Sequence, residues 1–259
     1  MLLKDKVAVI YGAGGGIGGA VARAFAHEGA RVFLTGRSLE TVKAAAAEIA
    51  SAEAAEVDAL DEQAVDSHLQ SVIDSAGRVD ISFNAIGIPN AEILGVPLTD
   101  LRAEHFFEPI MSYTTSYFLT ARLAARRMLP NRSGVIMTVT ALHSRTGLPL
   151  VGGYGPAMAA KEALTRDFSA ELAPHGIRVV GLRPQGMPET RTIRDAFEPR
   201  AKASGMTWEQ WQELLASRTH SRRLMALEEM ANVAAFMASD RASGITGTTV
   251  NLTMGSLDD

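Results

Sequence analysis

Short runs of apolar and β-branched residues alternate along this chain with longer segments whose apolar positions recur at helical spacing. The short runs are typical of buried strands, and the longer segments are typical of amphipathic helices. Strands are expected near residues 6–12, 31–36, 54–59, 79–87, 134–140, 177–184 and 248–253. Helices are expected near residues 17–29, 39–51, 61–77, 100–129 and 154–174. This alternation predicts parallel βαβ units, hence an α/β fold in three layers: a doubly wound parallel sheet with helices on both faces.

Residues 185–225 interrupt the alternation and predict an insertion of short helices. Trp208 and Trp211 lie three residues apart there, and two leucines follow, so one helix face is apolar. We expect this face to pack on the domain, to form a lid over a pocket at the carboxyl ends of the strands, or to do both. No linker or repeat divides the chain, so residues 1–259 are predicted to form a single domain that includes this substrate or lid segment at about 185–225.

Composition and charge narrow the classes of function. The net charge of −4 provides no basic field for nucleic acid or anionic lipid. Cysteine is absent, which excludes disulfides, thiolate catalysis and cysteine-ligated zinc, and no spacing of His, Asp and Glu suggests a metal site. The N-terminal segment does not resemble a signal peptide, and no run approaches the ~18 apolar residues of a membrane span. A cytoplasmic protein that acts on a small molecule is therefore expected.

A glycine-rich turn, YGAGGGIG at residues 11–18, joins the first predicted strand to the first predicted helix. So tight a turn requires residues that can adopt positive φ, and a pyrophosphate that approaches the backbone leaves no room for Cβ atoms. The helix behind the turn offers unpaired N–H groups and a partial positive charge. In this context the turn predicts a dinucleotide-binding site. Its predicted contacts are Gly12, Gly14, Gly16, Ile17 and Gly18.

Two further positions concern the choice of dinucleotide. Arg37 follows the second strand, where folds of this kind contact the adenosine ribose. Gly36 provides no carboxylate for a 2′-hydroxyl, whereas Arg37 provides a cation for a 2′-phosphate, so NADP(H) is favoured over NAD(H). The alternative is an ordinary surface arginine. Asp58, after the third strand, is a candidate acceptor for the adenine amino group or, equally, the cap of a turn.

Taken together, these motifs resemble the short-chain dehydrogenase/reductase family over essentially the whole chain. YGAGGGIG is similar to the family's TGxxxGIG, and FNAIG, which contains Asn84 and Gly87, is similar to its NNAG motif. Tyr154 and the following ALTRDFSAELAPHGIRV match the active-site helix and the sixth strand. The resemblance implies a Rossmann-type oxidoreductase whose nicotinamide cofactor also contacts Asn84 and Gly87. It further implies a homodimer or homotetramer that associates through the long central helices.

The resemblance also implies four catalytic positions. In the family a tyrosine transfers the carbonyl proton, a lysine four residues later binds ribose and lowers the tyrosine pKa, a serine holds the carbonyl, and an asparagine anchors a water. The corresponding positions here hold Tyr154, Met158, Ala141 and Tyr113, so the tyrosine alone is retained. A thioether can neither stabilise a phenolate nor donate to ribose. Weak turnover on simple ketones is therefore expected.

Lys161 is a candidate to replace the missing lysine. Seven residues return to nearly the same helix face, with a rise of about 10.5 Å, and a flexible lysine is predicted to reach back part of that distance. Tyr154 and Lys161 have a spacing similar to the catalytic pair of enoyl-thioester reductases, a branch of the same superfamily. Pro156 suits a first helical turn and raises the alternative that the helix begins there, leaving Tyr154 in a loop. Other polar candidates near Tyr154 are Thr140, His143 and Ser144.

Two functions follow from these residues. The first is an NADP(H)-dependent oxidoreductase that acts on a carbonyl or a conjugated enoyl small molecule, with Tyr154 and Lys161 as catalytic residues. The second is a dinucleotide-binding protein without turnover, which acts as a sensor or scaffold.

Overall fold

The computed structural model describes residues 1–50, 52–88 and 94–257, with the backbone alone at residues 199, 200 and 203. Its seven strands form one parallel sheet in the order β3-β2-β1-β4-β5-β6-β7. The strands are β1 (Val7–Tyr11), β2 (Arg31–Gly36), β3 (Glu53–Glu56), β4 (Ile81–Asn84), β5 (Gly134–Val139), β6 (Ile177–Pro184) and β7 (Thr248–Leu252). The predicted seven-stranded, doubly wound α/β fold is confirmed.

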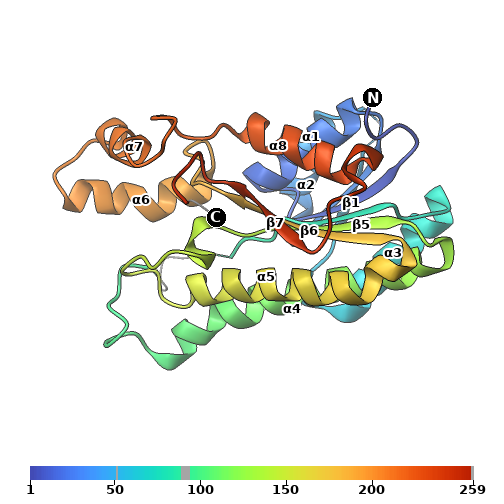
Figure 1. Ribbon diagram of the computed structural model, residues 1–259, viewed down its shortest axis with the longest axis horizontal. Helices are drawn as coiled ribbons and strands as arrows, with labels where there is room; N and C mark the ends of the chain where they lie inside the picture. Colours follow the sequence, from blue (N-terminus) through green and yellow to red (C-terminus); the bar gives the residue numbers. More distant parts are fainter. Residues whose placement is uncertain (51, 89–93, 258–259) are drawn as a thin grey trace.

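Helices cover both faces of the sheet and complete the three layers (Figure 1). On one face lie α1 (Gly16–His27), α2 (Leu39–Ala47) and α8 (Leu227–Ala238). On the other face lie α3 (Glu62–Ala76), α4 (Ala103–Met128) and α5 (Tyr154–Leu172). The expected insertion contains α6 (Arg191–Ala203) and α7 (Trp208–Ala216), which extend beyond the sheet on the left of Figure 1.

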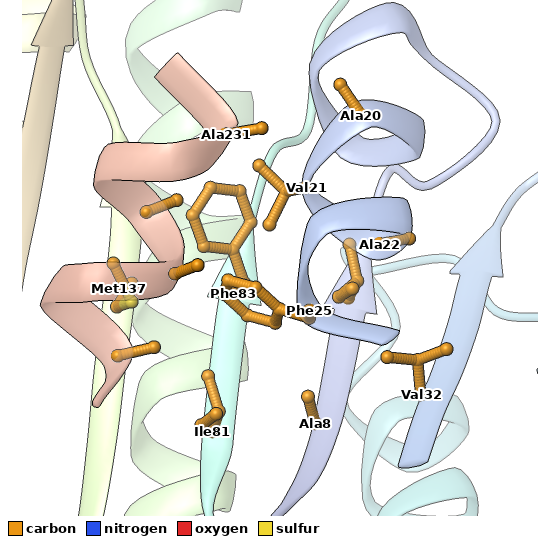
Figure 2. Close-up of a cluster of buried hydrophobic side chains, with 14 of the residues drawn as sticks. Ala8, Ala20, Val21, Ala22, Phe25, Val32, Ile81, Phe83, Met137 and Ala231 are labelled. Carbon is orange, nitrogen blue, oxygen red and sulfur yellow. The ribbon is translucent and has the colours of Figure 1, made fainter. Parts of the chain in front are cut away.

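The core between the sheet and helices α1 and α8 explains why the strand sequences are continuous apolar runs. Strand residues that point to this face, among them Ile81 and Met137, pack under small and apolar residues of the two helices (Figure 2). Phe25 of α1 meets Phe83 of β4 edge to face, with ring centroids 6.0 Å apart. Because both faces of each central strand are covered, both alternating sets of side chains must be apolar.

The sequence pattern differs from the structure at a few boundaries. The pattern did not predict α8, whose alanines and methionines pack closely on α1 and the sheet. Helix α2 ends at Ala47 and strand β4 at Asn84, both earlier than expected, and residue 51 lies outside the described residues. None of the helices in the described ranges is long and apolar enough to cross a membrane.

Candidate active site

The glycine turn lies where the chain passes from β1 into α1, beside the point at which the strand order changes direction. Gly12 has φ +78°, and a Cβ added there would lie 2.6 Å from the Ala85 carbonyl oxygen. A Cβ on Gly18 would lie 2.4 Å from the Gly12 carbonyl oxygen. These two positions therefore require glycine for the turn itself.

The start of α1 fits a phosphate group. Its N-cap residue is Gly15, so no side chain caps the N–H groups of the first turn. The first helical residues, Gly16 to Gly18, correspond to the predicted contacts Gly16, Ile17 and Gly18. Uncapped N–H groups at the positive end of a helix dipole can bind an anion, so the start of α1 fits the pyrophosphate contacts, which stay a prediction.

The residues predicted to contact the adenosine half lie at the ends of β2 and β3. Arg37 is exposed directly after β2. A Cβ on Gly36 would lie 2.9 Å from Val42 Cγ2, so a larger side chain, including a carboxylate, would crowd α2. Asp58 accepts a hydrogen bond from the Leu60 backbone N–H at 3.0 Å and thus caps a turn. Its contact with adenine stays a prediction.

Asn84 and Gly87 differ in their surroundings. The Asn84 side chain is 1% exposed, and its Nδ2 donates to Thr120 Oγ1 at 3.1 Å, which ties β4 to α4. In this structure Asn84 thus links β4 to α4, and its contact with the cofactor stays a prediction. Gly87 is exposed, and a Cβ there would meet no heavy atom within 4 Å, so the backbone beside it is open.

Tyr154 is the first residue of α5, so the alternative that the helix begins at Pro156 is wrong. Proline is accommodated in the first turn because the N–H groups there have no intrahelical acceptor. Gly153, the N-cap, allows the close approach of α5 to α4: a Cβ on Gly153 would lie 1.9 Å from the Phe106 carbonyl oxygen. The close packing of Gly153 on the Phe106 backbone therefore places Tyr154 near the carboxyl end of the sheet.

Two rings pack edge to face on Tyr154. The Tyr113 ring centroid lies 5.7 Å away, and the His143 ring centroid lies 5.3 Å away. Burial raises the pKa of the Tyr154 hydroxyl above its ordinary value, and the neighbouring Tyr113 raises it further. The environment therefore holds Tyr154 as a neutral phenol, a proton donor.

The side chains around Tyr154 form a small apolar cluster. Met158 is 2% exposed and packs with Tyr113 and Ala157, and Ala141 lies against the same group. The Tyr113 hydroxyl accepts a hydrogen bond from the Ile88 backbone N–H at 3.3 Å. Burial raises the pKa of Tyr113 to about 12, although this hydrogen bond lowers it in part.

Lys161 points into the layer between α5, α4 and β5. It is 1% exposed, and its Nζ donates to the Val139 carbonyl oxygen at 2.7 Å. The ammonium nitrogen also lies 5.6 Å from the Tyr113 ring centroid and 5.7 Å from the Tyr117 ring centroid. Burial lowers the pKa of Lys161 to about 7. Lys161 and Tyr154 thus both contact Tyr113, but the structure does not bring Lys161 to the Tyr154 hydroxyl.

A buried ion pair lies beside the site, and the sequence pattern did not predict it. Glu162 of α5 and Arg183 of β6 are each 3% exposed at the side chain, and Arg183 Nε donates to Glu162 Oε1 at 2.8 Å. Thr140, one of the three polar candidates, is 3% exposed and donates to the same carboxylate, so it does not face Tyr154. Of these candidates, His143 is the one whose ring packs on Tyr154. No group of metal-ligating side chains is found among the described residues.

Comparison with known proteins decides the family. Residues 12–256 match a family model described as Enoyl-(Acyl carrier protein) reductase. The chain is 30% identical to the peroxisomal 2,4-dienoyl-CoA reductase ((3E)-enoyl-CoA-producing) of Pongo abelii, over 95% of this chain and 82% of that protein. The chain belongs to the short-chain dehydrogenase/reductase family.

Other members of the short-chain dehydrogenase/reductase family resemble this chain from end to end. The chain is 28% identical to the uncharacterized oxidoreductase YxjF of Bacillus subtilis (strain 168), over 98% of both chains. The crystal structure of NAD+-bound xylitol dehydrogenase superposes with a TM-score of 0.89 at 27% identity, over 98% of this chain and 100% of that one. The chain is thus an oxidoreductase of this family by sequence and by fold, and the family uses a nicotinamide dinucleotide.

Proposed function

We propose that this protein is an NADP(H)-dependent oxidoreductase with a depleted active site, which reduces a carbonyl or a conjugated enoyl group of a small molecule through Tyr154. The observation that carries the proposal is the placement of Tyr154. It is a neutral phenol at the carboxyl end of the sheet, at the start of α5. The matching family model and the dienoyl-CoA reductase relative support the enoyl alternative for the substrate.

The residues of this chain divide the reaction between two regions. The N-terminus of α1 and the glycine turn would hold the pyrophosphate, and Arg37 would hold the 2′-phosphate. When bound, NADPH supplies a hydride to the substrate. Tyr154 donates the proton from its hydroxyl to the substrate atom that gains negative charge. Tyr113 and Met158 exclude water from the inner side of the phenol.

The active site is depleted because the side chains around the Tyr154 phenol lack the usual polar groups. The positions that hold lysine, serine and asparagine in typical family members hold Met158, Ala141 and Tyr113 here, and these side chains pack together. None of them supplies a positive charge to the phenolate that forms when Tyr154 gives up its proton. Lys161 Nζ donates to the Val139 carbonyl, whereas the His143 ring packs directly on Tyr154. We therefore assign the position next to the phenolate to His143 rather than to Lys161.

The apolar surroundings of Tyr154 also favour a second candidate, a dinucleotide-binding protein without turnover. An activity assay distinguishes the two candidate functions. The protein is incubated with NADPH and a panel of ketones, aldehydes and enoyl thioesters, and NADPH oxidation is followed by absorbance at the nicotinamide band. Slow oxidation with at least one compound supports the reductase. Tight NADPH binding with no oxidation across the panel supports the second candidate.

The cofactor preference gives a direct prediction. NADPH is expected to bind more tightly than NADH, because Arg37 is exposed at the end of β2 and Gly36 offers no carboxylate. Loss of one charge-assisted phosphate contact in Arg37→Ala should weaken NADPH binding by about 1.5–3 kcal/mol and leave NADH nearly unchanged. Fluorescence titration of both cofactors measures this. Equal affinities in the wild type, or equal losses in the variant, contradict the assignment.

We further propose that the chain forms a symmetric dimer or tetramer through its long helices. Helix α4 exposes three large apolar side chains along its length: Phe107 is 55% exposed, Met111 is 61% exposed and Phe118 is 39% exposed. Light scattering at micromolar concentration should give a mass of two or four chains. A monomer mass would contradict the proposal.

A further inference from the structure

Glu162 is a buried carboxylate that the proposed proton transfer does not use. It lies on α5 about two helical turns after Tyr154, and its side chain is 3% exposed. A carboxylate this deeply buried is costly unless it is paired and hydrogen-bonded. The hydrogen-bond partners of the Glu162 carboxylate therefore indicate its role.

The Glu162 carboxylate joins α5 to three other segments of the chain. Thr140, directly after β5, donates its hydroxyl to Oε1 at 3.1 Å. Ser144, in the 3-10 turn η2 (Leu142–Ser144), donates to the same oxygen at 2.6 Å. Arg183, near the end of β6, donates Nε to Oε1 at 2.8 Å and Nη2 to Oε2 at 2.9 Å.

These contacts keep Glu162 ionised. Burial alone would raise the pKa of its carboxyl, but the hydrogen bonds from Arg183, Ser144 and Thr140 and the charge of Arg183 together lower the pKa below its ordinary value. Charge-assisted hydrogen bonds of this kind are among the strongest that a side chain makes. The ionised carboxylate is thus held in one position on α5 by its hydrogen bonds.

The turn η2, which is bonded to Glu162 through Ser144, contains the His143 ring that packs on Tyr154. His143 is the middle residue of η2, and its ring packs edge to face on Tyr154 at 5.3 Å. Tyr154 and Glu162 belong to one helix, so the hydrogen bond from Ser144 to Glu162 fixes η2 relative to that helix. Together with the ion pair between Arg145 Nε and Glu162 Oε2 at 3.5 Å, this bond holds the His143 ring near the Tyr154 phenol.

We propose that Glu162 is a positioning residue of the active site: through Ser144 it holds η2 on α5 and so keeps the His143 ring against Tyr154. This inference rests on the proposed reduction through Tyr154. Arg183 orients the carboxylate from the sheet through its two hydrogen bonds, and the bond from Ser144 attaches the turn to the carboxylate in that orientation. When the phenol donates its proton, the polar ring of His143 is then the side chain held next to the new phenolate.

The test compares two variants that each remove one hydroxyl from the same oxygen, Glu162 Oε1. Ser144→Ala breaks the bond from η2 to Glu162. Thr140→Val breaks the bond from the end of β5 to Glu162 and the longer contact of the same hydroxyl with the Leu182 carbonyl, and both variants leave the Arg183 pair in place. Ser144→Ala should lower kcat about tenfold with an unchanged NADPH affinity, because misplacement of a catalytic group slows chemistry more than binding. Thr140→Val should stay within about twofold of the wild type. Equal losses of kcat in the two variants would overturn the proposal.

A second measurement does not depend on turnover. The ring protons of His143, assigned by their loss in His143→Asn, should show NMR shifts displaced by the ring current of Tyr154. Ser144→Ala should move these signals toward free-histidine values, and Thr140→Val should leave them in place. His143 signals that do not move in Ser144→Ala overturn the positioning role. If no compound of the panel is reduced, the proposed function fails, while the His143 signals still decide whether Glu162 holds the turn.

Discussion

Met158→Lys is expected to raise the rate of NADPH oxidation by this protein about ten- to a thousandfold. An ammonium a few ångströms from a partly buried phenolate is worth about 1–4 kcal/mol at an effective dielectric near 20, and each 1.4 kcal/mol of barrier is about tenfold in rate. Met158 lies within the cluster that packs on Tyr154, so a lysine amine at this position starts close to the phenol. Adding Ala141→Ser should increase the rate more than either change alone, because the proton donor and the carbonyl holder act as one unit.

Steady-state assays of the wild type, both single variants and the double variant measure these gains. Met158→Leu is the matched control, because it keeps the volume and the apolar character and should leave the rate nearly unchanged. If the wild type already works at ordinary rates and Met158→Lys slows it, the site is not depleted. Lys161→Ala should then abolish activity, which would make Lys161 the partner of Tyr154 after a rearrangement.

Lys161→Met should stabilise the protein near neutral pH. In the folded state the pKa of Lys161 is about 7, against 10.5 for a free lysine. Between these two values the unfolded chain binds more protons than the native one, so the free energy of unfolding should rise with pH across about pH 7–10. Below pH 7 the full cost of burying the ammonium is present. Replacing it by methionine removes this cost but also the bond to Val139, for a net gain of about 1–3 kcal/mol at pH 7.

Urea unfolding at several pH values tests this prediction. The stabilities of the wild type and Lys161→Met should approach each other as the pH rises from 7 toward 10.5, because the native lysine is already neutral in that range and the unfolded lysine loses its proton only near pH 10.5. Lys43→Met is the control, because Lys43 is exposed on α2 and its replacement should shift stability little at any pH. A constant difference between wild type and Lys161→Met from pH 6 to pH 10 would mean that Lys161 titrates normally in the fold.

The fold was predictable because local pattern and topology agree. A strand that is covered on both faces must be apolar at nearly every position, so β1 and β5 could be recognised from composition alone. The glycine turn was predictable for a similar reason: Gly12 and Gly18 leave no room for a Cβ against neighbouring backbone. Helix α8 was not, since Val233 and the exposed Phe236 lie outside its buried face and blur the amphipathic stripe.

The interior of the site was predictable only in part. Helical spacing places Lys161 on the Tyr154 side of α5, but it does not say whether a side chain turns toward the helix start or into the layer below. In the structure the Lys161 side chain turns into the layer below the helix, where it contacts the Val139 carbonyl and two tyrosine rings. The Glu162–Arg183 pair joins a helix to a strand across the fold, and no local pattern carries that information. The available signal was the helical spacing that places Glu162 on the same inner face of α5 as Met158 and Thr165.

We propose that Tyr154 is the proton donor of a slow NADPH-dependent reductase. Tyr154→Phe tests it most directly, because it removes only the hydroxyl and keeps the ring that packs between Tyr113 and His143. With the most reactive compound of the panel, the variant should bind NADPH as tightly as the wild type and lose about 100-fold or more of the oxidation rate. An unchanged rate in Tyr154→Phe would contradict the account.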